Sequence, residues 1–373
     1  GSSHFGSSHF GASCTGFKTA LPRASPPLPQ DSERAMAATA QAFEFHSEQQ
    51  AVRGPDPKRR KLEEAEMQQE TTSGCPSSSS ASDAASSSEA EPLVGPKPQK
   101  AYANASFLNS SQARLIRVLC ELEEPKARLD AEGVENIVMF FGSARAKPQA
   151  EYEAAVQEAE AAAVASPGDA KAQASLQRLR KQAFLIPMFD AVRDLTRMMT
   201  EWSMKRAKEG KPQYHVGTGG GPGMMTAANH GASLAGGKSV GFGISLPFED
   251  GLNPYVTPSL GFEYHYFFTR KFWMTYKCMG LVVAPGGLGT CDELFELLTL
   301  MQTGKVKRML PVILIGKKFW HSCINWEAFI DYGMISEQDA RQLIFADTAE
   351  EAFPHLIAGI ERLEATPVVH KKR

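Results

Sequence analysis

The sequence predicts an α/β protein built on one doubly wound parallel sheet with helices on both faces, preceded by a disordered N-terminal tail. From about residue 111 onward, short apolar runs alternate with longer segments whose apolar residues recur at helical spacing. Two of the runs end in glycine-rich loops that lead directly into a helix. Strands alternating with helices form parallel sheets, and such sheets bind ligands at the carboxyl ends of their strands.

Residues 1–103 are predicted to be a disordered, low-complexity tail. Residues 21–100 are rich in Pro, Ser, Ala, Gln and Glu, and such a composition buries too little apolar surface to offset the entropy of ordering. The basic run Lys58-Arg59-Arg60-Lys61 resembles a nuclear-import signal, or it is a solvated charge cluster. Residues 104–373 are predicted to form the folded domain.

The folded domain is predicted to begin with a helix capped by Ser111 and then a buried strand at 136–141. The helix places apolar residues at helical spacing, namely Leu115, Ile116, Leu119 and Leu122. Residues 149–183 are rich in strong helix formers and have few large apolar side chains, which predicts a helical insertion with a turn at 166–169.

The rest of the domain alternates regularly between strands and helices. Strands are predicted at 214–216, 240–244, 281–284 and 310–315, and helices at 186–208, 224–235, 268–277 and 291–302, followed by C-terminal helices.

Charge and cysteine content narrow the class of protein. With 40 basic and 42 acidic side chains, the chain lacks the cationic excess that nucleic-acid binding requires. The six cysteines are scattered without metal-ligand spacing, which favours a reducing, cytoplasmic compartment and no metal. No apolar run reaches the roughly 18 residues of a membrane span. The chain begins at Gly1, so a targeting segment upstream is left open.

The first glycine loop spans residues 217–223, between a strand and a helix. Glycine allows close backbone approach, and a helix N-terminus presents N–H groups to an anion, so a phosphate site is expected. The alternative is a tight turn that only packs the strand on the helix. The candidate contacts are Gly219, Gly220, Gly221 and Gly223, together with Ser143 after the first strand.

The second loop, residues 285–290, repeats this arrangement and ends in Thr290, predicted to be an N-cap with its hydroxyl facing the site. Both loops are expected to converge on one anionic ligand. Three carboxylates follow at Asp292, Glu293 and Glu296. Upstream, Arg270 and Lys271 lie at a helix start, where cations oppose the helix dipole, so a ligand anion is expected there; a surface basic pair is the alternative.

The Arg-Lys pair with the downstream motif Pro-Gly-Gly-x-Gly-Thr-x-x-Glu resembles the Lonely Guy family of phosphoribohydrolases, which activate cytokinin nucleotides. The resemblance covers about 107–363 and includes Phe-Gly-Ser-Ala-Arg at 141–145, Leu-Pro-Phe-Glu at 246–249 and Asn-Pro-Tyr-Val at 253–256. It implies a Rossmann-like fold and usually a homodimer or larger homo-oligomer. Older names for such proteins say lysine decarboxylase, but no residue here demands pyridoxal phosphate, and no cofactor is expected.

The resemblance also implies roles for individual residues. The catalytic pair falls on Arg270 and Glu293. The implied substrate contacts are Glu249, Lys271, Gly286, Gly287, Gly289, Thr290 and Thr299.

The expected reaction is hydrolysis of the N-glycosidic bond of a nucleoside 5′-monophosphate to free base and ribose 5-phosphate. A carboxylate beside the anomeric carbon stabilises the positive charge that develops there and orients water, a role assigned to Glu293. The base stays open between a cytokinin and an ordinary purine or pyrimidine. The alternative function is a nucleotide sensor or carrier with the same loops and no hydrolysis.

Overall fold

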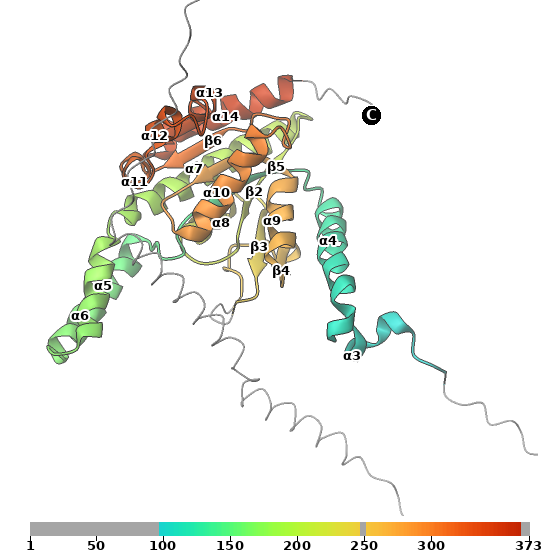
Figure 1. Ribbon diagram of the computed structural model, residues 1–373, viewed down its shortest axis with the longest axis horizontal. Coiled ribbons are helices and arrows are strands. Elements are labelled where there is room, and N and C mark those ends of the chain that lie inside the picture. The colour runs from blue at the N-terminus through green and yellow to red at the C-terminus, as the bar shows by residue number, and fades with distance from the viewer. Residues whose placement is uncertain (1–96, 247–250, 367–373) are drawn as a thin grey trace, which may run out of the picture. The chain divides into compact units, whose positions relative to one another are not determined.

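The computed structural model describes residues 97–246 and 251–366. The chain divides into two units, Gly1–Gly95 and Pro96–Arg373, and the described residues belong to the second. At its centre lies a parallel sheet of seven strands in the order β4-β3-β2-β1-β5-β6-β7 (Figure 1). The predicted doubly wound α/β fold is therefore confirmed. The predicted tail and its basic run lie outside the described residues, and the boundary at Asn104 stays a prediction.

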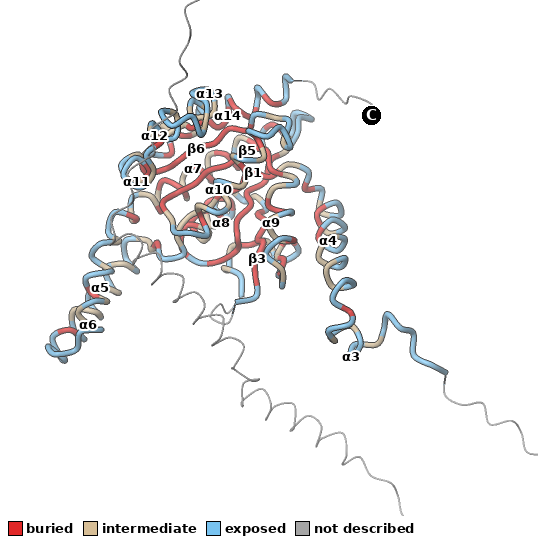
Figure 2. Tube along the Cα trace, viewed as in Figure 1, coloured by how far each residue is buried: buried red, intermediate tan, exposed pale blue. Residues whose placement is uncertain are grey.

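The strands are short, and the central ones are almost wholly buried, as Figure 2 shows. Every neighbouring pair in the sheet is parallel. Apolar side chains dominate β1, β5 and β6, as expected for strands covered on both faces. The strands are β1 (Asn136–Phe141), β2 (Tyr214–Thr218), β3 (Ser239–Ile244), β4 (Gly261–Tyr264), β5 (Cys278–Val283), β6 (Val312–Ile315) and β7 (Leu343–Ala346).

Helices cover both faces of the sheet. On one face α7 (Leu185–Lys208) packs against α8 (Met224–Leu234) and α14 (Ala349–Ala365). On the other face α9 (Phe267–Tyr276) lies beside α10 (Leu288–Gln302), and α4 (Arg114–Ala131) packs against α9 (Figure 1). The short helices α11 (Lys317–Cys323), α12 (Trp326–Asp331) and α13 (Glu337–Ala340) follow β6. No helix among the described residues is long and apolar enough to cross a membrane.

The strand order reverses direction at β1. The chain builds β2, β3 and β4 outward on one side of β1 and then returns to place β5 on the other side. In such sheets the carboxyl ends of the two strands at the reversal point bound a crevice that binds ligands. The segments that follow β1 and β5, together with the one that follows β2, are therefore the ones that can form a site.

The segment predicted to be a helical insertion contains two helices, α5 (Gln149–Ala165) and α6 (Ala170–Lys181), which pack against each other. Their connection falls on the predicted turn, and Asp169 caps α6 by accepting a hydrogen bond from Lys171 N. Only Ala163 and Leu176 are buried in the pair, so the hairpin contributes little to the core.

One expectation about α4 was wrong. Ser111 begins a 3₁₀ turn, η2 (Ser111–Ala113), and does not cap the helix, because α4 starts only at Arg114. The apolar spacing is helical, as predicted, yet Leu115 and Leu119 are 76% and 57% exposed. The helix packs on α9 through other positions, and this apolar stripe faces outward.

Two edge strands were not predicted. Strand β4 follows the 3₁₀ turn η3 (Pro258–Leu260), and β7 lies among short helices. Each has four residues, which is too short for apolar periodicity to distinguish a strand from a loop. The remaining short elements are η1 (Ala101–Ala103) and α3 (Ala105–Leu108).

Candidate functional site

Three loops meet at the carboxyl ends of β1, β2 and β5 and are joined through their backbones. Ser143 N donates to Pro285 O at 2.9 Å, and Met224 N donates to Ser143 O at 3.0 Å. Gly223 has a φ of +73°. A Cβ there would lie 2.3 Å from the Ser143 carbonyl oxygen, so the approach of the two loops requires glycine. The loops form one rigid rim around the crevice.

The first glycine loop is fixed by polar side chains that sequence reasoning gave no role. The Thr218 hydroxyl accepts from Gly220 N at 2.9 Å and donates to the Asn229 carboxamide oxygen at 2.7 Å. The Asn253 side-chain amide lies 3.0 and 3.1 Å from the carbonyl oxygens of Gly220 and Gly221 and 2.9 Å from the Asn229 oxygen. The only sequence signal was the presence of Asn253 in one of the blocks shared with the Lonely Guy family.

The second glycine loop forms the start of α10. Gly287 is the N-cap residue, and no described side chain caps the helix, so the prediction that Thr290 is the N-cap was wrong. Thr290 lies inside the first turn, where its side chain packs on Gly286. A Cβ at Gly287 or Gly289 would meet no described atom within 4 Å. The first N–H groups of a helix have no partner within it, and here they adjoin open space.

A cavity of about 580 Å³ lies between these loops, within the roughly 300–1,000 Å³ usual for small-molecule sites. It is lined by seven of the predicted site residues, namely Ser143, Gly219, Arg270, Gly287, Gly289, Thr290 and Glu293. Phe267, Met225 and Arg145 also line it. Arg270 and Glu293 therefore face one cavity although they come from different helices.

Several predicted residues do not line this cavity. Four glycines of the two loops pack against neighbouring protein atoms and do not border the cavity, namely Gly220, Gly221, Gly223 and Gly286. The Thr299 hydroxyl donates to Phe295 O at 2.7 Å, and the side chain lines a separate cavity of about 120 Å³ between α10 and α12. Glu249 lies outside the described residues.

Glu293 is the most deeply buried carboxylate of the site, with 11% of its side chain exposed. Its Oε2 atom is enclosed and has no hydrogen-bond partner among the described residues. Burial raises the pKa of Glu293 to about 7, although the nearby charges of Lys271 and Arg270 act to lower it. A carboxyl group with such a pKa can both accept and release a proton near neutral pH.

Arg270 connects the end of β3 to the first glycine loop. Its Nε donates to Phe242 O at 2.8 Å. A Cβ at Gly219 would lie 2.5 Å from a terminal guanidinium nitrogen, so the guanidinium lies directly against this glycine. The absence of a side chain at Gly219 makes room for Arg270 at the cavity wall.

Lys271 points away from the cavity and toward α10. Its ammonium lies 2.9 Å from Asp292 Oδ1, 2.8 Å from Glu296 Oε2 and 3.9 Å from Glu293 Oε2. Only 18% of its side chain is exposed. The two cations of the Arg-Lys pair therefore have different partners.

The N-terminal turn of α9 already holds an anion from the protein. The Glu121 carboxylate, from α4, accepts from His265 N at 2.9 Å, from Tyr266 N at 3.4 Å and from the Thr269 hydroxyl. Glu121 therefore supplies a negative charge at this helix start, and the expectation that Arg270 and Lys271 meet a ligand anion stays a prediction.

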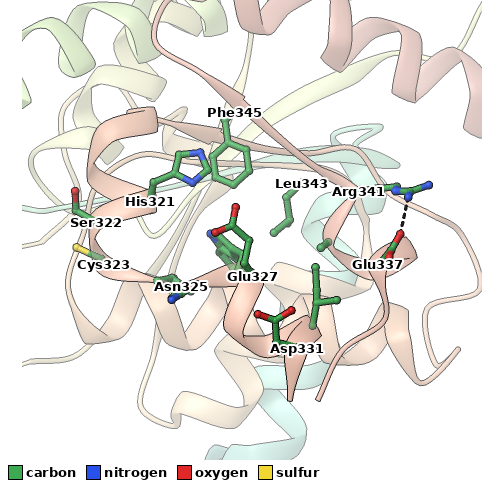
Figure 3. Close-up of a pocket in the computed structure, with 14 residues that line it drawn as sticks. His321, Ser322, Cys323, Asn325, Glu327, Asp331, Glu337, Arg341, Leu343 and Phe345 are labelled. Atoms are coloured by element: carbon green, nitrogen blue, oxygen red, sulfur yellow. Dashed lines mark hydrogen bonds and ion pairs between the residues drawn. The ribbon is translucent and has the colours of Figure 1, made fainter. Parts of the chain in front are cut away.

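A second hollow, of about 810 Å³, lies over β7 among α11, α12 and α13 (Figure 3). Its walls carry charged side chains including Glu327, Asp331 and the ion pair of Arg341 with Glu337. None of the predicted site residues lines it, and it is distant in the fold from the reversal point of the sheet. Its size alone does not make it the site.

Across the described residues, no group of three or more His, Cys, Asp or Glu side chains is arranged to hold a metal ion.

The segment that contains α8 to α10 and most of the site matches a known family. Residues 225–356 match the family model described as "Possible lysine decarboxylase". This segment is similar to that family. The match agrees with the older name attached to Lonely Guy proteins, and it contains Arg270, Lys271 and the whole second glycine loop. A comparison with curated proteins finds no match.

Solved structures similar to the chain include the structural-genomics target TM1055, with a TM-score of 0.36 and 21% identity over 60% of this chain and 99% of that one. A molybdenum cofactor binding protein from Rippkaea orientalis has a TM-score of 0.35 and 17% identity over 60% and 96%. A Moco carrier protein from Chlamydomonas reinhardtii has a TM-score of 0.34 and 19% identity over 62% and 98%. These TM-scores are too low to carry an argument about function.

Proposed function

We propose that the protein hydrolyses the N-glycosidic bond of nucleoside 5′-monophosphates, releasing the free base and ribose 5-phosphate. One observation carries the proposal: the buried carboxylate of Glu293 and the guanidinium of Arg270 line the same cavity as the two glycine loops. Binding a phosphate needs only the loops, whereas a buried carboxylate beside them adds a group that can act in chemistry.

The 5′-phosphate is assigned to the start of α10. The N–H groups around Gly289 and Thr290 adjoin the cavity, and the positive end of the helix dipole favours an anion. The open space beside Gly287 and Gly289 lets a phosphate oxygen reach the backbone. The cavity volume, about 580 Å³, accommodates a nucleoside monophosphate, whose sugar is then held without a metal.

Glu293 is assigned the central chemical role. As the bond between the base nitrogen and C1′ breaks, the electron pair leaves with the base, and positive charge develops on the ribose. The carboxylate stabilises that charge and accepts a proton from the water that attacks C1′. A pKa of about 7 suits a general base at neutral pH. The proton passes to the departing base, so one water is consumed for each bond broken.

Arg270 is assigned to the departing base or to the phosphate. Its guanidinium is permanently charged and offers several donors in a plane, so it can stabilise negative charge on either group. The hydrogen bond to Phe242 O and the contact with Gly219 hold the guanidinium in place before the substrate binds. Such fixed charge costs no reorganisation during the reaction.

The proposal is tested by incubating the full chain with AMP, with adenosine and with a panel of purine, pyrimidine and cytokinin nucleoside monophosphates. Free base and ribose 5-phosphate are quantified by chromatography. We expect equimolar release from monophosphates and at least tenfold slower release from adenosine, which lacks the phosphate. Tight binding of AMP without release would instead support the sensor or carrier function. The panel also identifies the preferred base.

We further propose a homodimer. Three aromatic side chains on one side of α9, Phe268, Phe272 and Tyr276, are 57%, 41% and 59% exposed, and the outward stripe of α4 adds Leu115 and Leu119. Apolar patches of this kind on a folded domain mark association surfaces. Light scattering after gel filtration measures the mass of the particle, and a Phe272→Glu variant should shift this mass to that of the monomer.

No nucleic-acid partner is proposed, and a cytoplasmic location is proposed on the cysteine pattern alone.

A further inference from the structure

Lys271 follows Arg270 directly in sequence, yet it does not share the cavity. We infer that Lys271 is a positioning residue, whose charge favours the carboxylate form of Glu293 over the protonated form, and that it makes no contact with the substrate. The role of Lys271 in catalysis rests on the proposed function, but the effect of its charge on the titration of Glu293 can be measured without turnover. It replaces the phosphate-contact role that the family resemblance implies for this lysine.

The surroundings of Lys271 leave no room for a ligand. The side chain lies in a gap of about 10 Å³, about enough for one water, between α9, α10 and the sheet. The gap is walled by the apolar side chains Met139, Phe141, Met274, Leu281 and Leu297. On the side of the larger cavity Asp292 already pairs with the ammonium, so a phosphate group would have to displace this carboxylate to reach it.

The same surroundings strengthen the attraction between the ammonium and the carboxylates. Charges interact more strongly where water is excluded, and Lys271 is only 18% exposed. Its ammonium is within hydrogen-bond distance of Asp292 and Glu296 and 3.9 Å from Glu293 Oε2. It is thus placed to offset the exposed carboxylate of Asp292 and the half-buried one of Glu296, which would repel the more deeply buried Glu293.

Among residues 97–246 and 251–366, the charged groups that act on Glu293 come from two helices. Arg270 and Lys271 on α9 favour its charged form, and Asp292 and Glu296 on α10 oppose it. From the sheet, the Cys278 thiol lines the same gap, and burial raises its pKa to about 11, which leaves it neutral. Lys271 lies within 4 Å of all three α10 carboxylates, those of Asp292, Glu293 and Glu296.

The test follows the titration of Glu293 by carboxyl ¹³C NMR in the full chain labelled with ¹³C-glutamate, and a Glu293→Gln variant assigns its signal. We expect Lys271→Met to raise the pKa of Glu293 by about one unit, the lower end of the effect of removing one opposite charge. Lys271→Arg should keep it near the wild-type value. Glu296→Gln should lower it, because a repelling charge is lost.

Turnover of AMP gives the second readout. In Lys271→Met the acid limb of the pH profile should move upward by the same unit, which lowers activity at pH 6 about tenfold, while KM for AMP stays within about twofold. A titration of Glu293 that is unchanged in both Lys271→Met and Glu296→Gln overturns the inference. A tenfold rise in KM with unchanged titration assigns Lys271 to the substrate instead. If wild-type protein releases no base, the proposed function fails, and the NMR titration still decides the role of Lys271.

Discussion

The Glu121 carboxylate accepts a hydrogen bond from the hydroxyl of Thr269, and through this contact α4 holds the N-terminal turn of α9. The same carboxylate accepts backbone N–H groups of His265 and Tyr266, and the Trp273 indole donates to Glu121 O at 2.9 Å. A residue that precedes the sheet in sequence thus fixes the helix that carries Arg270. The position of the Arg270 guanidinium therefore depends on this set of contacts between Glu121 and α9, which we call the Glu121 clamp.

Replacing Glu121 should weaken the domain and the site together. Glu121→Ala leaves the donors at the start of α9 without an acceptor, and the free energy of unfolding should fall by about 1–2 kcal/mol, the usual cost of a lost helix cap. Glu121→Gln keeps the shape and one acceptor, so its loss should be smaller. Urea unfolding followed by circular dichroism measures both. Equal stability of wild type and Glu121→Ala would show that the clamp contributes nothing.

The glycines at the start of α10 should respond differently from the glycine of the first loop. Gly287→Ala and Gly289→Ala place a methyl group in open space, so the melting temperature should change little while the affinity for AMP falls at least tenfold. Gly223→Ala is the contrasting variant, because its Cβ would collide with the Ser143 carbonyl at a positive φ, and it should lower the melting temperature. Calorimetry measures both quantities. Unchanged AMP affinity in both α10 variants would remove the phosphate from this helix.

Asn253 should control the order of the first glycine loop. Asn253→Ala removes the side-chain amide from the carbonyl oxygens of Gly220 and Gly221, which keep Asn253 N and the Thr226 hydroxyl as their donors, so the loss should cost about 1 kcal/mol. We expect faster hydrogen exchange in residues 219–223 and a higher KM for AMP. Exchange measured by mass spectrometry should remain unchanged in α14, which serves as the internal control. Unaltered exchange in the loop would contradict the role of Asn253.

Stability should depend on pH through Glu293. Its pKa is raised in the folded state, from 4.5 to about 7, so the folded protein holds this proton more tightly than the unfolded chain does. The stabilisation is full below about pH 4.5 and is lost as the pH rises to about 7. Ionisation then costs of the order of 3 kcal/mol, since one pKa unit corresponds to about 1.4 kcal/mol.

Glu293→Gln cannot ionise, so it should lose less stability than wild type between pH 5 and pH 8. Urea midpoints at the two pH values give the comparison. Parallel changes in the two proteins would show that Glu293 titrates normally.

Much of the fold could be predicted from sequence because the signals for its strands, helices and loops lie within short segments of the chain. Strand β1 and the helices around the glycine loops have clear periodicity and clear breaks, and the loops follow strands in both cases. The edge strands β4 and β7 were missed because four residues carry no period of their own, and they form through pairing with β3 and β6. The outward face of α4 could not be predicted, because periodicity shows that a helix has an apolar side but not what covers it.

The site was predictable to the level of the loops and the pair Arg270 and Glu293, whereas the direction of single side chains was not. Residues Glu293 and Thr299 are six positions apart on α10, so their side chains differ by about 240° around the helix axis, and they reach different cavities. The side chains of Arg270 and Lys271 point about 100° apart around the axis of α9, so they contact different partners. Contacts between distant segments, such as Glu121 with α9, leave no local signal in the sequence.

The most direct test measures AMP binding and adenine release in parallel for wild type, Glu293→Gln and the control Glu327→Gln, which alters an exposed carboxylate in the other hollow. We expect wild type and the control to release adenine and ribose 5-phosphate in equal amounts. Glu293→Gln should bind AMP with an affinity within about threefold of wild type and release adenine at least a hundredfold more slowly, in the range lost when a positioned acid or base is removed. Release at the wild-type rate by Glu293→Gln would contradict the assignment of this carboxylate to the reaction.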